Sequence, residues 1–343
     1  MLSIVKTQSG RGHLELRERP RPQPGLGQVV LEVIAAGVCG TDLHIEDGEF
    51  PCSPPVALGH EIGGVVVSAG AGVPESLLGA RVATETYFAT CGHCAACRAG
   101  RINLCPDRQS IGSHVDGGFA HQILLPARNL HPVPERLSDA AVSLCEPLAC
   151  VCQCLCDPAA VSPGDKVLVI GPGPMGLLSA QVARAQGGSV TLLGTDRDSV
   201  RLAAGRQLGF NVAEGGSQAG PTALDGAFDV VVECSGSAGG AGSALRAIRK
   251  GGRYVQVGLS GKPLLIDMDE FCYREVDFRT GFASTPRSWR RALALIDEGL
   301  VNLETLVTGI FPLTGWTEVF HATRSGEGVK FVFDPRLNEG STS

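Results

Sequence analysis

The pattern of apolar and polar residues divides the chain into two regions of different texture. In the first region, residues 1–150, short apolar runs such as 29–34 and 62–67 are separated by Pro- and Gly-rich stretches. Such stretches mark turns between short strands. We therefore expect residues 1–150 to form a unit rich in β-structure.

From residue 166 onward, apolar strands alternate with helical segments. Four runs rich in apolar residues indicate buried strands at 166–170, 189–193, 228–235 and 253–258. A helix is expected over 177–185, and Asp198 is expected to cap a second helix that runs to Leu208. Strands that alternate with helices form βαβ units around a parallel sheet. The second region therefore predicts an α/β domain.

The last part of the chain adds one more helix and one more strand. The segment 288–299, SWRRALALIDEG, has a helical pattern, and the segment 330–335, KFVFDP, indicates a strand. The charged positions of 288–299 are typical of a solvated face of an amphipathic helix rather than of a binding surface.

Composition and charge favour a packed globular protein of about two domains. Of the 343 residues, 43% are hydrophobic and 19% are charged. The 29 basic and 35 acidic residues give a net charge of −6, and no stretch gathers enough Lys or Arg to bind nucleic acid. No apolar run reaches the roughly 18 residues of a membrane span. The N-terminus lacks the apolar core of a secretion signal, so a cytoplasmic protein is expected.

The turn that follows the strand 166–170 has the spacing of a dinucleotide-binding motif. In the sequence GPGPMG, Gly171, Gly173 and Gly176 form G-x-G-x-x-G, with Pro174 and Met175 inside the motif. Glycines at this spacing let the backbone approach a pyrophosphate, whose charge the N-terminus of the next helix stabilises. Because the turn joins a strand to a helix, we expect it to bind a dinucleotide.

An acidic residue lies where this fold binds the adenosine ribose. Asp196 is twenty residues beyond Gly176, at the end of the next strand. Its charge would repel the 2′-phosphate of NADP, so NAD is the expected cofactor, although Arg197 and Arg201 lie close enough in sequence to pair with such a phosphate. The other expected cofactor contacts are Arg201, Val257, Gly258 and Leu259.

One loop contains four cysteines with the spacing C-x2-C-x2-C-x7-C: Cys91, Cys94, Cys97 and Cys105. Four thiolates can close a tetrahedral zinc site and leave no position open for a substrate, which predicts a structural zinc. An iron–sulfur cluster can also be held by four cysteines, but the compact loop favours zinc. The odd total of 13 cysteines argues against a disulfide framework.

A second set of possible metal ligands is dispersed along the chain: Cys39, His60, Glu61 and Glu146. One sulfur, one imidazole and carboxylates with room for water are what a catalytic zinc requires. Spacing alone does not group these residues.

Taken in order, the motifs resemble the zinc-dependent medium-chain dehydrogenase/reductase superfamily. G-V-C-G-T-D-L-H, G-H-E, the four-cysteine loop, E-P-L and GPGPMG follow one another over nearly the whole chain. The resemblance implies an α/β fold with a GroES-like, β-rich catalytic domain over 1–150, which contains the structural-zinc loop 91–105. It further implies a Rossmann NAD-binding domain with a doubly wound parallel sheet over 151–283, and a segment 284–343 that returns to the catalytic domain.

The same resemblance implies roles for the dispersed ligands. Cys39 and His60 would bind the catalytic zinc, and Glu61 would be an adjacent ligand or a carboxylate just outside it. Glu146 matches a glutamate of the polyol-dehydrogenase branch, which replaces the third-ligand cysteine of other alcohol dehydrogenases. Two Zn2+ ions per chain are therefore expected, together with NAD.

The implied reaction is the reversible, NAD-dependent oxidation of a secondary alcohol, a polyol or sugar-derived hydroxyl, to a ketone. Zinc would act as the Lewis acid, and Thr41 would accept the hydroxyl proton and pass it towards solvent through the cofactor ribose and His44. The expected catalytic residues are thus Thr41, His44 and Glu61. The expected partner is a small-molecule alcohol, and the expected assembly is a homodimer or homotetramer.

Two alternatives stay open. Sorbitol-type enzymes usually carry an aromatic residue after the relay histidine and an Arg-Tyr pair further on, where this chain has Ile45 and Phe282-Ala283-Ser284. A histidine followed by isoleucine resembles the sequence of threonine dehydrogenases, so a threonine-type amino-alcohol dehydrogenase is one alternative. Those enzymes, however, typically lack E-P-L. The other is a non-catalytic zinc- and dinucleotide-binding relative, against which the presence of a proton relay argues.

A further cysteine run directly follows E-P-L: Cys150, Cys152, Cys154 and Cys156. On a helix these residues would lie on two faces, and on a strand they would be too spread out to converge on one ion. The resemblance places a helix here, so we interpret them as buried, unreactive thiols.

Overall fold

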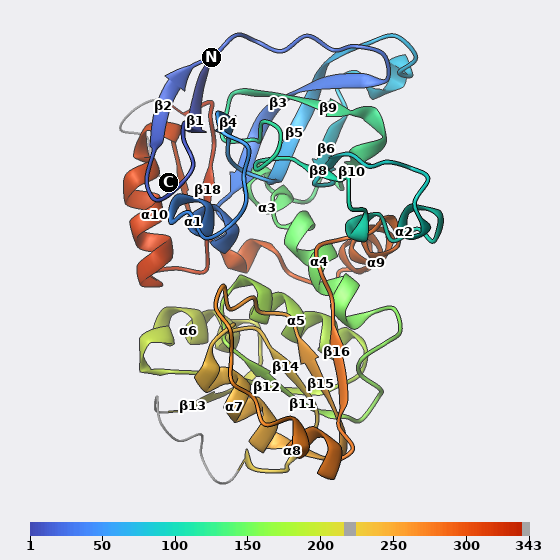
Figure 1. The fold of residues 1–343 in the computed structure, drawn as a ribbon, viewed down its shortest axis with the longest axis vertical. Helices are drawn as coiled ribbons and strands as arrows, with labels where there is room; N and C mark the ends of the chain where they lie inside the picture. The colour runs from blue at the N-terminus through green and yellow to red at the C-terminus, as the bar shows by residue number, and fades with distance from the viewer. Residues whose placement is uncertain (216–223, 338–343) are drawn as a thin grey trace. The chain divides into compact units, whose positions relative to one another are not determined.

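The computed structural model describes residues 1–215 and 224–337 (Figure 1). The chain forms two compact units: unit 1 contains Met1–Glu146 and the chain from Val307 onward, and unit 2 contains Pro147–Leu306. No helix among the described residues is long and apolar enough to cross a bilayer.

Unit 1 is built on a mainly antiparallel sheet of seven strands. Six of them follow one another in the order β10 (Leu130–Pro132), β6 (Arg81–Thr84), β5 (Glu61–Ala69), β3 (Gln28–Gly37), β18 (Lys330–Phe333) and β17 (Val307–Phe311), and β9 (Gln122–Pro126) also pairs with β3. Strand β3 is the longest element of this sheet, because its run of valine, isoleucine and alanine residues is buried on both faces except at Glu32. The C-terminal strand β18 pairs with the end of β3, so segments about 300 positions apart in sequence lie side by side.

The remaining elements of unit 1 are short. Strand β1 (Leu2–Lys6) lies between β2 (Leu14–Glu18) and β4 (Val56–Ala57), and β7 (Tyr87–Ala89) pairs with β8 (Gln109–Ser110). The helices are α1 (Gly40–Glu46), α2 (Ala95–Arg98), α3 (Asp139–Val142) and α10 (Trp316–Ser325). Helix α4 (Cys145–Leu155) begins in unit 1 and continues into unit 2.

Aromatic packing joins the N- and C-terminal parts of unit 1. The fully buried ring of Phe119 meets Phe333 edge to face, with 4.9 Å between the ring centroids, and also contacts Phe320 of α10. Gly59 lies under the same ring with φ +92°, and a Cβ there would be 2.4 Å from the Phe119 ring. The loop just before β5 therefore requires glycine at this position.

Unit 2 is a six-stranded parallel sheet. Its strand order is β13 (Asn211–Glu214), β12 (Ser189–Gly194), β11 (Lys166–Ile170), β14 (Phe228–Glu233), β15 (Ile248–Gln256) and β16 (Asp277–Thr280). Numbered along the chain within this unit, the order is 3-2-1-4-5-6, that of the doubly wound dinucleotide-binding fold. The order reverses between β11 and β14, and ligands bind at such a switch point.

The helices of unit 2 connect these strands. They are α5 (Pro174–Ala185), α6 (Ser199–Gln207), α7 (Ala238–Ala247), α8 (Met268–Tyr273) and α9 (Pro286–Asp297). Helix α5 begins at Pro174 rather than at residue 177, because Gly173 caps it and proline suits the first helical position.

The expected cap of α6 is wrong in one respect. Asp198 occupies the N-cap position, but its side chain makes no hydrogen bond to α6. Instead, the carboxylate accepts hydrogen bonds from the backbone N–H and the hydroxyl of Thr195, both at 2.9 Å. It therefore closes the 3-10 turn Asp196–Asp198 that precedes the helix.

The C-terminal segment expected over 284–343 is divided between the two units. Helix α9 belongs to unit 2, and the chain becomes part of unit 1 only at Val307, with β17. Residues 338–343 of the expected segment lie outside the described residues.

Candidate active site and metal centres

One candidate metal centre forms where β3 ends and β5 begins. These two strands are antiparallel and Gly37 pairs with Glu61, so Cys39, just beyond β3, faces His60, just before β5. One ligand atom from each of Cys39, His60 and Glu61 lies within 4.8 Å of the others. Residues dispersed in sequence thus supply a sulfur, an imidazole and a carboxylate to one place, a donor set that fits zinc.

Glu61 also belongs to a buried ion pair. Its two carboxylate oxygens lie 2.7 and 2.8 Å from Nζ of Lys330 on β18, and both residues are almost completely buried. Burial alone would lower the pKa of Lys330, but the negative charges of Glu61, Cys39 and Asp42 together outweigh burial and raise it. Gly37 makes room for this pair, since a Cβ there would be 2.2 Å from a Glu61 oxygen.

Asp42 lies on the other side of the imidazole. One of its oxygens is 3.6 Å from Nδ1 of His60, and the other accepts a 2.9 Å hydrogen bond from the Cys39 backbone N–H at the start of α1. Nδ1 faces a carboxylate, so Nε2 is the nitrogen free to bind a metal. The oxygen nearest Nδ1 is Oδ1 of Asp42, which is buried and has no hydrogen-bond partner among the described residues. It is therefore placed to accept a proton from Nδ1–H.

The two expected relay residues lie three positions apart on α1 and so share a face of the helix. The hydroxyl of Thr41 is 3.7 Å from Sγ of Cys39, which places it beside the candidate metal centre. The ring of His44 is partly exposed, and its Nδ1 is 2.8 Å from the carboxylate of Glu49. Sequence reasoning identified Thr41 and His44 but missed the Glu49 contact.

Glu146 lies in the first turn of α4 and is 5% exposed. Within the described chain, the group of ligand atoms within 4.8 Å of one another contains Cys39, His60 and Glu61 but not Glu146. Its expected role as a ligand therefore stays a prediction.

The four-cysteine loop forms the second candidate metal centre. Sulfur atoms of Cys91, Cys94, Cys97 and Cys105 all lie within 4.8 Å of one another. Backbone N–H groups of the loop point at these sulfurs: that of Cys94 donates to Cys91 at 3.3 Å, and that of Cys97 donates to Cys94 at 3.4 Å. Such donors stabilise thiolates. The Cys94 N–H is the main reason why the pKa of Cys91 falls to about 6.

Two glycines of G-x-G-x-x-G, Gly171 and Gly176, are required by close contacts with the surrounding chain. Gly171 has φ +89°, and a Cβ there would be 2.7 Å from the Ser235 backbone nitrogen at the switch point of the sheet. A Cβ at Gly176 would be 1.9 Å from the Gly171 carbonyl oxygen, whereas a Cβ at Gly173 would meet no atom within 4 Å. The turn is therefore tight at Gly171 and Gly176 and open at Gly173, where a pyrophosphate would approach the backbone.

The acidic residues after β12 have different surroundings. Asp196 is exposed, and no hydrogen bond or ion pair involves its carboxylate among the described residues. Asp198 is engaged by Thr195 and lies 3.7 Å from the guanidinium of Arg201. Asp196 is thus available to a ribose, while Asp198 partly neutralises Arg201.

A buried carboxylate missed by sequence reasoning joins the two loops beside the glycine turn. Glu233, at the end of β14, accepts hydrogen bonds from the backbone N–H groups of Ser235 and Gly236 at 2.8 and 3.0 Å, and from Gln256 at 2.7 Å. Its own carbonyl accepts the N–H groups of Val257 and Gly258, two of the expected cofactor contacts. Leu259, the third, is 62% exposed. The acidic residue at the end of the apolar strand was the signal that could have revealed this role.

Two family models match the chain: the alcohol dehydrogenase GroES-like domain over residues 25–135, and the zinc-binding dehydrogenase over residues 174–298. The sorbitol dehydrogenase of Halalkalibacterium halodurans is 38% identical, over 98% of this chain and 99% of its own. The chain belongs to the zinc-dependent medium-chain dehydrogenase/reductase superfamily.

Two further relatives of this dehydrogenase show the range of the superfamily. The L-threonine 3-dehydrogenase of Saccharopolyspora erythraea is 33% identical over 97% of this chain and 99% of its own. A zinc-binding dehydrogenase of Sinorhizobium meliloti, solved with NADP bound, shares the fold with a TM-score of 0.87 and 31% identity, and the match covers 97% of this chain and 99% of that one. The protein is therefore an alcohol oxidoreductase that uses zinc and a nicotinamide dinucleotide.

We predict that the two metal centres separate by mutation. Cys97→Ala should lose one zinc and lower the melting temperature, because four-thiolate sites contribute folding free energy. Cys39→Ala should lose one zinc and the activity while the melting temperature changes less. Metal analysis and thermal melting measure both effects, with Cys272→Ala, an exposed thiol, as the control. Wild-type protein that holds fewer than two zinc ions after growth in ample zinc would contradict this prediction.

We also predict that the Lys330–Glu61 pair stabilises unit 1. Lys330→Met should lower the free energy of unfolding by about 3–5 kcal/mol, because it leaves a buried carboxylate unpaired. The double variant Lys330→Met with Glu61→Gln should recover part of that loss. The control is Arg324→Met, whose partly exposed ion pair with Glu46 and Asp47 should contribute about 0–1 kcal/mol. Urea unfolding measures the free energy of unfolding of each variant. Equal losses of this free energy for Lys330→Met and Arg324→Met would show that the buried pair contributes no more stability than the partly exposed pair.

Proposed function

We propose that this dehydrogenase oxidises a secondary alcohol of a polyol or sugar-derived substrate to a ketone, reversibly, with NAD. The observation that carries the proposal is the hydroxyl of Thr41, 3.7 Å from Sγ of Cys39 in the candidate metal centre. A protein that only binds zinc needs no proton acceptor there, whereas alcohol oxidation does. The glutamate of E-P-L and the 38% identical sorbitol dehydrogenase support the polyol class.

In this proposal the chain positions the substrate and moves its proton. Cys39 and His60, with Glu61 or Glu146, would hold a zinc that supplies Lewis-acid chemistry when bound. Thr41 accepts the hydroxyl proton. His44 lies one turn further along α1 and releases the proton to solvent, and Glu49 holds its ring by Nδ1.

The cofactor preference follows from the loop after β12. Among the residues that the structure describes, none pairs with the Asp196 carboxylate, which can accept hydrogen bonds from both ribose hydroxyls. Arg201, which could favour a 2′-phosphate, already faces Asp198. These contacts support NAD over NADP. The cytoplasmic location and the homodimeric or homotetrameric state stay predictions.

A threonine-type amino-alcohol dehydrogenase is the second candidate. The sequence His44-Ile45 favours it, as does the 33% identical threonine dehydrogenase. A panel of polyols, L-threonine and simple alcohols, assayed with NAD in both directions, decides between the two classes. Specificity (kcat/KM) at least tenfold higher for a polyol supports the proposal, and a tenfold preference for L-threonine replaces it.

We predict that Asp196 selects NAD. Asp196→Ala should weaken NAD binding by about 1.5–3 kcal/mol through loss of charge-assisted hydrogen bonds. It should also raise the relative use of NADP, because repulsion of the 2′-phosphate is removed. Fluorescence titration with both reduced cofactors measures this shift, with Asp269→Ala as an exposed charge-matched control. A wild-type preference for NADP would show that Arg197 and Arg201 outweigh Asp196.

We predict that Thr41 and His44 act in sequence on the proton. Thr41→Val should abolish oxidation at every pH while zinc and NAD still bind. His44→Ala should slow oxidation most at low pH, where bulk base is scarce, and added buffer base should restore part of the rate. Glu49→Gln, which keeps a hydrogen bond to the ring, is the matched control for His44. A pH profile unchanged by His44→Ala would remove His44 from the relay.

A further inference from the structure

The four cysteines that follow E-P-L differ in their surroundings and in the direction of their pKa shifts. Cys150, Cys152 and Cys154 lie on α4, and Cys156 follows its last residue. Burial raises the pKa of Cys154 to about 12 and hydrogen bonding to Cys156, together with burial, raises that of Cys152. Cys156 has different surroundings, and its pKa is lowered.

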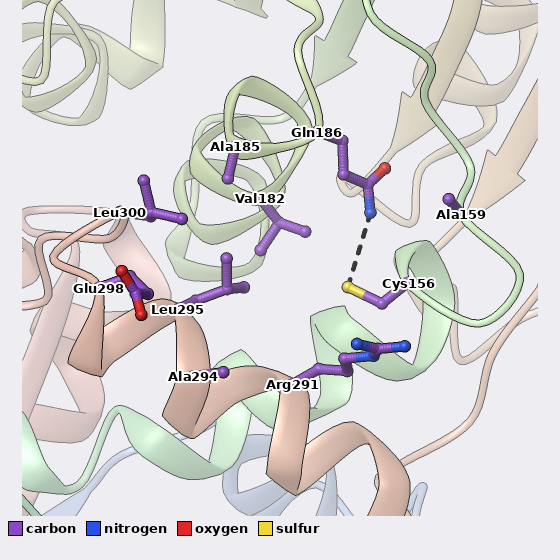
Figure 2. A pocket seen from close by; sticks show the side chains of 10 residues that line it. All are labelled: Cys156, Ala159, Val182, Ala185, Gln186, Arg291, Ala294, Leu295, Glu298 and Leu300. Carbon is purple, nitrogen blue, oxygen red and sulfur yellow. Dashed lines mark hydrogen bonds between the residues drawn. The ribbon is translucent and has the colours of Figure 1, made fainter.

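Cys156 lines an open pocket of about 350 Å³ in unit 2 (Figure 2). The pocket lies between the end of α4 and the helices α5 and α9, and most of its other lining side chains are alanine, valine and leucine. Its polar groups are Gln186, Arg291 and Glu298. Figure 2 shows Cys156 and Arg291 at one end of the pocket and Glu298 at the other. A small solute can therefore reach the sulfur without local unfolding.

Hydrogen-bond donors surround this sulfur. The amide Nε2 of Gln186 is 3.6 Å from Sγ of Cys156, and the same nitrogen donates to the Leu155 carbonyl at 2.8 Å, which holds the amide in place. The thiol of Cys152 also donates to Sγ of Cys156. The Cys152 hydrogen bond is the main reason why the pKa of Cys156 is lowered, and it outweighs burial and the charge of Asp157.

The charges next to this sulfur act in opposite directions: Asp157 raises the pKa of Cys156, and Arg291 lowers it. Asp157, the next residue, is held by two guanidinium groups: Arg287 at 2.6 Å and Arg291 at 3.4 Å. Two positive charges thus face one carboxylate beside the sulfur. A thiolate near cations and fixed donors is the reactive form of cysteine.

Cys152 is positioned to form a disulfide with Cys156. The backbone N–H of Cys156 donates to the carbonyl of Cys152 at 2.9 Å, so the two residues are one helical turn apart. Helical geometry then places their Cα atoms about 6 Å apart, which is within the range that a disulfide spans. Cys154 lies on another face of the helix and cannot make the same bond.

We propose that Cys156 is a site of reversible oxidation by peroxides, with Cys152 as the resolving thiol. The Cys156 thiolate attacks one peroxide oxygen and the O–O bond breaks. The sulfur loses two electrons and becomes a sulfenic acid, while the peroxide leaves as water or an alcohol. The Cys152 sulfur then forms an S–S bond to Cys156 as the S–O bond breaks, and its proton leaves with the oxygen as water.

The test treats the full-length, zinc-loaded dehydrogenase with hydrogen peroxide in the presence of dimedone, followed by proteolysis and mass spectrometry. Wild-type protein should yield a Cys152–Cys156 disulfide, which a thiol reductant reverses. Cys152→Ser should instead accumulate the dimedone adduct on Cys156, at least tenfold above wild type. Cys156→Ser should yield neither product, and Cys154→Ala should behave as wild type.

A second measurement tests the pocket independently of oxidation. Alkylation of Cys156 by iodoacetamide should slow several-fold in Arg291→Met and remain unchanged in Arg290→Met, whose side chain is exposed on the same helix. The melting temperatures of all variants show whether each is folded. Oxidation of Cys156 no faster than that of Cys154, or an equal yield of sulfenic acid with and without Cys152, would overturn the proposal.

Discussion

The buried ion pair between Glu61 and Lys330 holds together the part of unit 1 on which the chemistry depends. Two charges removed from water are tolerated only where each satisfies the other, and here the lysine also donates to the Val38 carbonyl at 2.9 Å. The pair therefore links the end of β3, the start of β5 and the C-terminal strand β18. Cys39 and His60 flank these strand ends, so the same contact that neutralises Glu61 also places the metal ligands.

Unit 2 also contains a buried carboxylate, but hydrogen-bond donors rather than a cation satisfy it. Glu233 is fully buried, and its carboxylate is surrounded by N–H and hydroxyl donors from the loop after β14 and by the amide of Gln256. These hydrogen bonds fix the backbone next to Gly171, the residue at which the chain turns towards the cofactor.

Local donors also give identical side chains different chemistry. Cys91 receives backbone N–H groups in a loop shaped for a metal, and Cys156 receives an amide and a thiol beside an open pocket. Burial raises the pKa of the Cys154 and Cys234 thiols, and the hydrogen bond between Cys234 and the Ser179 hydroxyl does not offset it. The number of cysteines in this chain therefore says less about reactivity than the groups that point at each sulfur.

The sequence by itself determined the features that depend on short spacings: the glycine turn, the four-cysteine loop, the alternation of strands and helices, and Thr41 beside Cys39. Neighbours in sequence are neighbours in space, so their spacing is informative. Only the tertiary structure decided that Lys330 pairs with Glu61, 269 positions away, that Asp198 turns back to Thr195, and that α9 shapes the pocket at Cys156. Those contacts join distant segments, and their partners follow from packing and desolvation rather than from any local pattern.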